Sequence, residues 1–287
     1  MLRFYPLLFV LLWSTGFIGA KYGLPFSEPL TFLSIRYALV IALMGAVAVI
    51  ARAPWPKDAR TVVHIGITGL LVHGVYLGGV FTAIKHGLPA GITSLVVGMQ
   101  PLLTAVGAGW LLRERISRWQ WLGLLLGFVG VALVVAGRAR LDTVAADTLV
   151  HMLWPALAAL LGITMGTLYQ KRYCPSFDLR TGSIVQFVPT LIVTALLASA
   201  SESMEVQWSG PFVFALLWLV LVLSLGAISL LNLLIRSGSA THVASLFYLT
   251  PPVTALMAWA LFDERLSTMA MIGMGIAVTG VWLARRK

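Results

Sequence analysis

His73 and Tyr76 are polar residues inside an otherwise apolar stretch, and their spacing places both on one face of a helix. A histidine and a tyrosine on one face can bind polar groups of a small solute, and a histidine in a cavity can also exchange protons near neutral pH. The alternative is a buried histidine that only hydrogen-bonds a neighbouring helix. The pair is therefore a candidate lining of a solute-binding cavity.

Arg36 is a strong charge inside a second apolar stretch, about seven residues and roughly 10 Å from the nearer end of that stretch. A guanidinium at this depth can hold a substrate carboxylate through two parallel hydrogen bonds. Bonds to neighbouring helix carbonyls, or a side chain that snorkels outward, are the alternatives.

Prolines interrupt two further apolar stretches at Pro101 and at Pro251-Pro252. Each removes helix hydrogen bonds, so we predict the hinge of a gate there, with a static kink as the alternative. Polar residues beside these prolines, and at the same expected depth elsewhere, complete the candidate site. The predicted substrate-binding residues are Trp13, Ser14, Thr15, Arg36, His73, Tyr76, Met99, Gln100, Thr164, Asn232, Tyr248 and Thr250. For Trp13 a lipid-facing or core position, and for Asn232 a bridge between helices, remain open.

Two acidic residues, Glu114 and Glu264, are each followed by arginine and end the stretches that contain the prolines. We interpret them as matched helix caps or gate contacts. The alternative is a solvated charge pair worth under about 1 kcal/mol.

Catalytic and metal-binding patterns are missing from the sequence. It has no GxSxG elbow, P-loop or HExxH motif, and its lone Cys174 cannot form a CxxC site. All ten acidic residues fall outside the centres of the apolar stretches, where an ion-coupled carrier usually keeps a carboxylate. We therefore expect no enzyme activity, no metal and no cofactor, and we favour facilitated movement over proton or sodium coupling.

The chain has 287 residues, of which 59% are hydrophobic and 10% charged, and this composition excludes an ordinary soluble protein. A membrane-spanning helix needs about 20 apolar residues. We predict an all-α integral membrane protein with ten such helices, at 5–22, 30–51, 61–84, 89–112, 119–137, 150–170, 180–199, 211–235, 240–262 and 268–284.

The basic residues alternate with these predicted helices. Fourteen lie on the side of the N-terminus and five on the opposite side. This bias predicts that both termini are cytoplasmic in a bacterial inner (plasma) membrane. It also accounts for the net charge of +10, so we expect no nucleic-acid partner.

An internal repeat relates the two halves of the chain, 1–140 and 149–287. An offset of 150 places Pro101 on Pro251 and Glu114 on Glu264, and it also places Gly123 on Gly273 and Gly130 on Gly280. Five helices per half is an odd number, so the second half would enter the membrane from the opposite side, as in inverted-repeat transporters.

The repeated pattern resembles the EamA family of the drug/metabolite transporter (DMT) superfamily. The resemblance rests on the segment from Gln100-Pro101 to Glu114-Arg115, with Gly123 and Gly130 after it, and on its repeat from Thr250-Pro251 to Glu264-Arg265. It covers nearly the whole chain and implies alternating access around a central cavity. Members move amino acids, sugars, nucleotides and other metabolites, so the resemblance is specific for the fold and weak for the substrate. The chain's size is similar to that of YddG-type amino-acid exporters.

We therefore expect a facilitative exporter of small metabolites, amino acids first, that contacts membrane lipid. The alternative is a carrier of a sugar, a nucleobase or a drug-like amine, coupled to protons through His73. Outside the transporter class, the remaining alternative is a membrane enzyme or a lipid scramblase. Glycines at 123, 127 and 130, and at 273, 275 and 280, predict close helix packing within a monomer, with the seam of a weak homodimer as the alternative.

Overall fold

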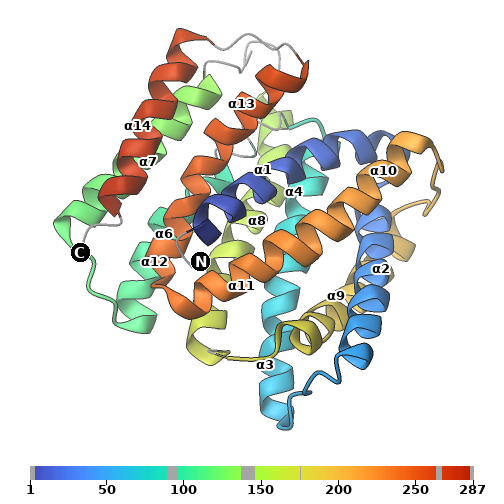
Figure 1. Cartoon of the computed structure of the whole chain (residues 1–287). Coiled ribbons are helices and arrows are strands. Elements are labelled where there is room, and N and C mark those ends of the chain that lie inside the picture. The colour runs from blue at the N-terminus through green and yellow to red at the C-terminus, as the bar shows by residue number, and fades with distance from the viewer. Residues whose placement is uncertain are drawn as a thin grey trace.

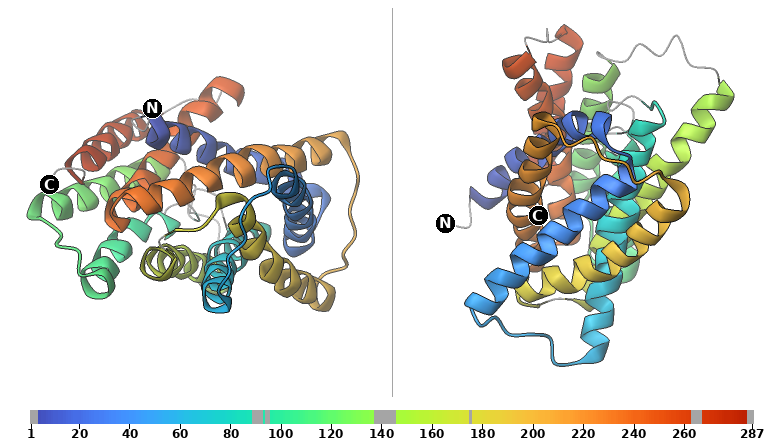
Figure 2. Two further views of the ribbon diagram at one scale, coloured as in Figure 1. Left: turned by 60° about the horizontal axis from the view of Figure 1, so that its bottom comes forward. Right: turned by 90° about the vertical axis from the view of Figure 1, so that its right-hand side faces the viewer.

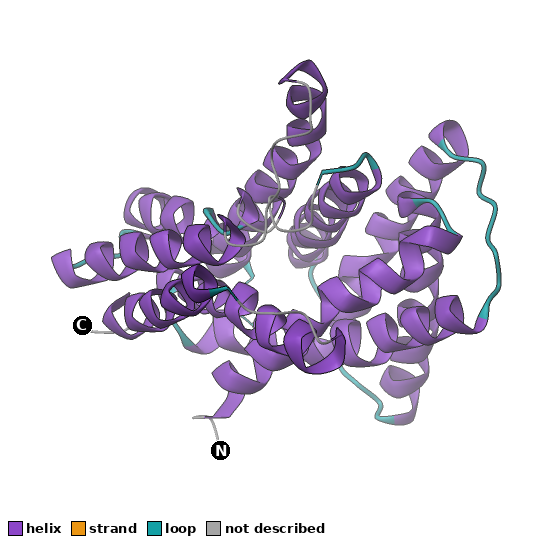
Figure 3. Cartoon of the chain, turned by 90° about the horizontal axis from the view of Figure 1, so that it is seen from above, coloured by secondary structure: helices purple, strands orange, loops and turns teal. Residues whose placement is uncertain are grey.

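The structure, a computed structural model, describes residues 4–88, 93, 96–136, 146–174, 176–262 and 267–284. These residues form helices joined by loops, and no strand occurs among them (Figure 3). One isolated antiparallel bridge joins Ser27 and Val206. The all-helical prediction is confirmed for the described part of the chain.

The first half contains α1 (Tyr5–Gly23), the 3-10 turn η2 (Leu24–Phe26), α2 (Pro29–Ile50), α3 (Ala59–Gly69), the π segment η3 (Leu70–Val75), α4 (Tyr76–Lys85), α6 (Gln100–Gly107), the π segment η4 (Ala108–Leu112) and α7 (Arg118–Ala136). The second half contains α8 (Ala146–Tyr173), α9 (Leu179–Ser201), α10 (Gly210–Trp218), the π segment η5 (Leu219–Ala227), α11 (Ile228–Ser237), α12 (Ala240–Ser245), the 3-10 segment η6 (Leu246–Leu249), α13 (Thr250–Phe262) and α14 (Thr268–Ala284) (Figure 1).

The predicted apolar windows agree with these helices to within four residues at each end that the structure describes. Residues 89–92, 94 and 95 of the fourth window lie outside the described residues. Four helical stretches are long and apolar enough to cross a membrane, namely Pro29–Ile50, Ala59–Lys85, Leu179–Ser201 and Gly210–Ser237. The number of ten spans and the orientation of the termini stay predictions.

Capping residues fix where several helices begin. The carboxylate of Asp58 accepts hydrogen bonds from the backbone of Arg60 and Thr61 at the start of α3. Bonds from the side chain and backbone of Thr61 hold the pKa of Asp58 below its usual range. Asp178 caps α9 in the same way, and the bond from the Arg180 guanidinium is the largest cause of its lowered pKa.

A second pair of carboxylates joins the loop before α2 to the loop after α9. Glu202 accepts hydrogen bonds from the backbone N–H groups of Leu30 and Thr31, at 2.8 and 2.7 Å, and from the hydroxyl of Thr31 at 2.7 Å. In return, Glu28 accepts a bond of 2.6 Å from the backbone N–H of Ser203. These loops are therefore tied together at one end of the helix bundle.

Helices from the two halves pack in pairs, with α7 beside α14, α2 beside α9, and α4 beside α8 (Figure 2). In the first pair the glycines leave no room for side chains. A Cβ on Gly130 would fall against the backbone of Ala277, and one on Gly123 would meet the backbone of Ala284. The predicted packing of these glycines within one chain is confirmed, except at Gly275, which has open space around it.

Candidate functional site

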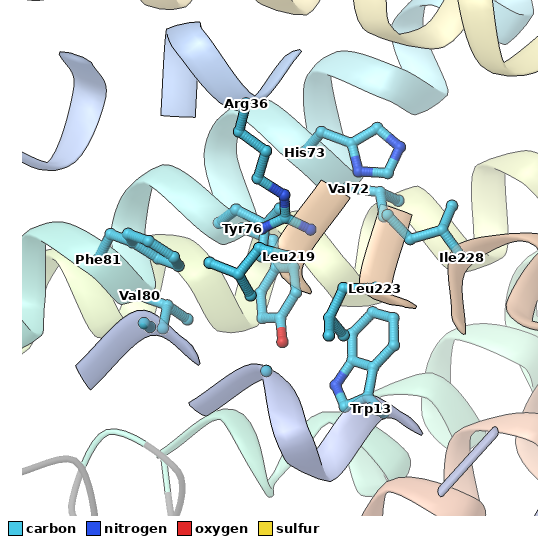
Figure 4. A pocket seen from close by; sticks show the side chains of 13 residues that line it. Trp13, Arg36, Val72, His73, Tyr76, Val80, Phe81, Leu219, Leu223 and Ile228 are labelled. Atoms are coloured by element: carbon cyan, nitrogen blue, oxygen red, sulfur yellow. The ribbon is translucent and has the colours of Figure 1, made fainter. Parts of the chain in front are cut away.

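A small cavity lies between α1, α2, the α3–η3–α4 stretch and the α10–η5–α11 stretch (Figure 4). Its volume of about 40 Å³ has space for roughly three waters. Four predicted binding residues meet there, Trp13, Arg36, His73 and Tyr76. The remaining lining is apolar: Gly16, Ala20, Val72, Leu77, Val80, Phe81, Leu219, Leu223 and Ile228.

Arg36 reaches the cavity from α2 and is only 2% exposed. Its Nε donates a hydrogen bond of 3.0 Å to the hydroxyl of Ser224. No carboxylate pairs with Arg36 in the described part of the chain, and none of its recorded bonds goes to a helix carbonyl. The side chain is buried and does not snorkel to the surface, and Figure 4 shows its guanidinium pointing into the cavity.

His73 is one of the residues that line the cavity, and its ring stacks on Phe187 of α9, with centroids 4.2 Å apart and planes 10° from parallel. Its backbone carbonyl accepts a bond of 2.8 Å from the Tyr37 hydroxyl. Both ring nitrogens are buried without a hydrogen-bond partner among the described residues. Buried polar atoms normally have partners, so these nitrogens suit a bound solute or water.

Aromatic rings form one wall of the cavity. The rings of Trp13 and Tyr76 are stacked, with centroids 6.3 Å apart and planes 12° from parallel. Phe9 and Phe247 pack against Trp13 from behind, each with its ring centroid 5.2 Å away. This support holds the Trp13 indole in place, so the cavity wall is formed before a solute binds.

Two π segments position residues around the guanidinium. His73 belongs to η3, and Leu219, Leu223 and Ser224 belong to η5. A π turn holds one residue more than an α turn, which redirects the side chains after it, and such turns occur frequently at functional sites. The two segments lie at corresponding places under the 150-residue offset, since residues 70–75 map to 220–225.

Four predicted residues bridge helices or bond within one. Ser14 donates to the carbonyl of Val10 and approaches that of Thr250, and Thr15 accepts a bond from the Trp218 indole. Thr164 donates to the carbonyl of Leu160 in its own helix. Asn232 accepts a bond of 2.9 Å from Gln170, which is the bridging role left open from the sequence. None of these four lines the cavity.

Residues beside the prolines also lie outside the cavity lining. Gln100, Tyr248 and Thr250 are buried, and their side chains hold polar atoms without a partner in the described residues, whereas Met99 is half-buried. Pro101 lies in the first turn of α6, directly after a break at residues 98 and 99. Pro251 and Pro252 are the second and third residues of α13, which directly follows the 3-10 segment η6. The predicted interruptions of both helices are present, and their use as hinges stays a prediction.

Glu114 contacts the start of α12 directly. Its carboxylate accepts bonds from the backbone N–H of Ala240 at 3.0 Å and from the hydroxyl of Thr241 at 3.3 Å. From α8, Lys171 donates to the carbonyls of Ile235 and Gly238 at 2.8 and 2.5 Å, and so it holds the end of α11. The turn between α11 and α12 is thus held by an acidic and a basic side chain. Glu264 lies outside the described residues.

Sequence reasoning missed Ser224, Leu219, Leu223 and Phe81. Ser224 could have been singled out as the lone hydroxyl in the run Leu219–Ala227. The apolar residues carry no such signal, because lipid-facing and cavity-facing leucines look alike in a sequence.

The chain belongs to the EamA-like transporter family, whose model matches twice, over residues 4–136 and 151–286. It is therefore a membrane transporter, and the family resemblance seen in the sequence is confirmed.

Several relatives are similar over nearly the whole chain. The uncharacterized transporter YvbV of Bacillus subtilis is 27% identical over 97% of this chain and 89% of its own length. A "Probable amino-acid metabolite efflux pump" of Salmonella typhimurium is 26% identical over 98% of this chain and 93% of its own. A protein of Escherichia coli with the same description is 25% identical over 96% of this chain and 92% of its own. These descriptions indicate a transporter and not an enzyme.

A solved structure described only as "Crystal structure of protein" superposes on the chain with a TM-score of 0.80. It is 22% identical and covers 98% of this chain and 95% of that one. The likeness shows that the fold exists in a crystallised protein.

Proposed function

We propose that the chain exports small carboxylate-bearing metabolites, namely amino acids and the acids derived from them, across the bacterial inner membrane without an ion gradient. The observation that carries this proposal is the buried Arg36 guanidinium, which faces the cavity without a carboxylate partner among the described residues. A buried charge is costly unless it is paired, so a solute carboxylate is its natural partner. The descriptions of the Salmonella and Escherichia relatives support an amino-acid-derived solute.

Alternating access between two inverted halves is the proposed route. The packing of the helices supports this route. Each of the ten predicted helices has a counterpart five positions away in the order of the chain. When every helix is replaced with its counterpart, the following packed pairs are recovered. The second predicted helix pairs with the seventh (α2 with α9), and the fifth pairs with the tenth (α7 with α14). The third packs on the sixth (α4 with α8), and its counterpart is the packing of η5, in the eighth, on the first (α1). This is the arrangement expected of two repeats related by a pseudo-twofold axis.

The test reconstitutes the purified protein in liposomes and measures the uptake of labelled solutes. The solutes are threonine, methionine, an aromatic amino acid, a sugar and a quaternary amine. Saturable amino-acid flux that is unchanged by a pH gradient would support the proposal. Flux of the sugar or the amine alone would refute the substrate assignment. As a matched pair, Arg36→Gln should lose the flux, whereas Arg60→Gln, which removes an exposed charge far from the cavity, should keep it.

A second candidate is a proton-coupled carrier of another metabolite. It is favoured by His73, whose side chain lines the same cavity and whose two ring nitrogens make no hydrogen bond within the described part of the chain. In the same liposomes, flux that requires a pH gradient and disappears in His73→Gln would favour this candidate over facilitated export.

A further inference from the structure

Resting on the proposed export function, we propose that the solute beside Arg36 moves as a net anion, a carboxylate with an apolar body. The inside-negative membrane potential then drives its export. Among solutes derived from amino acids, the site would prefer those whose amino group is absent or neutral over the zwitterions themselves.

The charge of the cavity is the first argument. Its ionisable lining groups come from three stretches, namely Arg36 from α2, His73 from η3 and Tyr76 at the start of α4. From α1 the cavity receives Trp13, and from the α10–η5–α11 stretch it receives Leu219, Leu223 and Ile228, none of which is ionisable. Arginine stays protonated at any pH that the protein meets, so the cavity carries a fixed positive charge.

Among the described residues, no acidic side chain lies in the cavity lining to balance that charge. The carboxylates whose side chains the structure describes are bound elsewhere or lie in loops: Glu28 and Glu202 join two loops, Asp58 and Asp178 cap helices, Glu114 holds α12, and Glu205 is exposed. None of them lines the cavity. A zwitterion would bring an ammonium beside the guanidinium with no carboxylate to receive it, and that placement is costly in a desolvated site.

The apolar walls of the cavity indicate what the rest of the solute is like. Leu219 and Leu223 cover the cavity opposite Arg36, and Val80 and Phe81 extend the apolar lining (Figure 4). The cavity of about 40 Å³ is smaller than any metabolite of this class, so binding must move these side chains apart. Gly16 and Gly19 lie directly under the two leucines, where a Cβ would approach their side chains to 3.2 and 3.0 Å. A compact aliphatic body therefore suits the space better than a polar one.

The energetic consequence follows from the transport cycle. A uniporter returns to its starting state after each cycle, so the contribution of Arg36 cancels and the charge moved equals the charge of the solute. A zwitterion then moves without regard to the potential, whereas a monoanion is pushed towards the positive side. Export needs no coupled ion in that case, which agrees with the lack of a carboxylate among the residues that line the cavity.

The test compares leucine with 4-methyl-2-oxopentanoate, which has the same carbon skeleton with a carbonyl in place of the ammonium group. Liposomes containing the full chain receive valinomycin and a tenfold potassium gradient directed inward, without a pH gradient. The oxo acid should accumulate about tenfold inside, because a monoanion distributes with the imposed potential. Reversing the gradient should reverse the accumulation, and leucine should not exceed its external concentration. Protein-free liposomes measure the leak.

Two variants locate the effect. Arg36→Lys keeps the charge but loses the two-pronged contact, so the oxo acid should enter roughly tenfold more slowly and reach the same final ratio. Arg60→Gln should match the native chain in both rate and ratio. If the native chain carries the oxo acid without accumulating it, or carries leucine in preference, the anion proposal is wrong and the export proposal stands. If it carries neither the oxo acid nor any amino acid, the export proposal fails as well.

Discussion

Replacing Glu114 with glutamine should open the transporter on the side where α11 meets α12. The carboxylate bonds two groups at the start of α12, the backbone N–H of Ala240 and the hydroxyl of Thr241. Glutamine keeps one oxygen acceptor but loses the charge and the second acceptor. A hydrogen bond to a charged group makes a net contribution of about 1.5–3 kcal/mol. Because this pair of bonds is partly solvated, we expect the substitution to lower the stability of the closed state by about 1–2 kcal/mol. The closed-to-open ratio should then fall about 5- to 30-fold.

The reporter for this opening is a single cysteine at Ser245, which is fully buried and lies about 7 Å deeper along the chain from Ala240. The native Cys174 is first replaced with serine. An impermeant maleimide, applied from the Glu114 side, should label Ser245→Cys about 5- to 30-fold faster in Glu114→Gln. Lys171→Met should act in the same direction, because Lys171 holds the adjoining end of α11.

The control is Glu205→Gln, which removes an exposed charge whose carboxylate makes no recorded bond. Its labelling rate should equal that of the parent. Equal labelling in Glu114→Gln and the parent, in a folded and monodisperse preparation, would refute the view that Glu114 holds this side closed.

Three further predictions concern stability in detergent. Gly130→Ala should lower Tm by several degrees, because its Cβ would meet the backbone of Ala277 and overpacking costs about 1–3 kcal/mol, whereas Gly275→Ala, placed in open space, should change Tm little. Glu202→Ala removes three bonds at the start of α2 and should cost about 2 kcal/mol of unfolding free energy by thermal denaturation, with Glu205→Ala as the unaffected comparison. Bonds to the start of α3 lower the pKa of Asp58 in the folded state, so its stabilising effect should be full above about pH 4 and lost as pH falls through that lowered pKa. Tm measured over a pH series should therefore be lower for Asp58→Ala than for the native chain at neutral pH, and the two curves should converge only at the acid end. Parallel curves would contradict this.

The sequence predicted the helices well because a run of about 20 apolar residues bounded by charges or prolines has few alternatives to a helix. It also brought Trp13, Arg36, His73 and Tyr76 into one set, since these polar or aromatic residues stand out against aliphatic neighbours. Their common cavity required the structure.

The rest of the site depended on helix rotation, which an almost uniformly apolar helix does not reveal. Ser14 and Thr15 follow Trp13 directly, and one residue turns a helix by about 100°, so they bond neighbouring helices outside the cavity lining. The π segments added a further shift that helical periodicity does not predict. Ser224 reaches Arg36 from such a segment, and no spacing rule in the sequence connects the two residues.

The close contact of α7 with α14 has a practical consequence for measuring motion in this transporter. The backbone at Gly130 meets that at Ala277, and the backbone at Gly123 meets that at Ala284. The two helices therefore cannot slide past each other without a steric clash. Neither helix contributes a residue to the cavity lining. Spin labels at Leu125 and Val278, both exposed, should therefore keep one separation through every step of transport. The distance between these two labels is then a constant reference, and movements of the other helices can be measured relative to this pair.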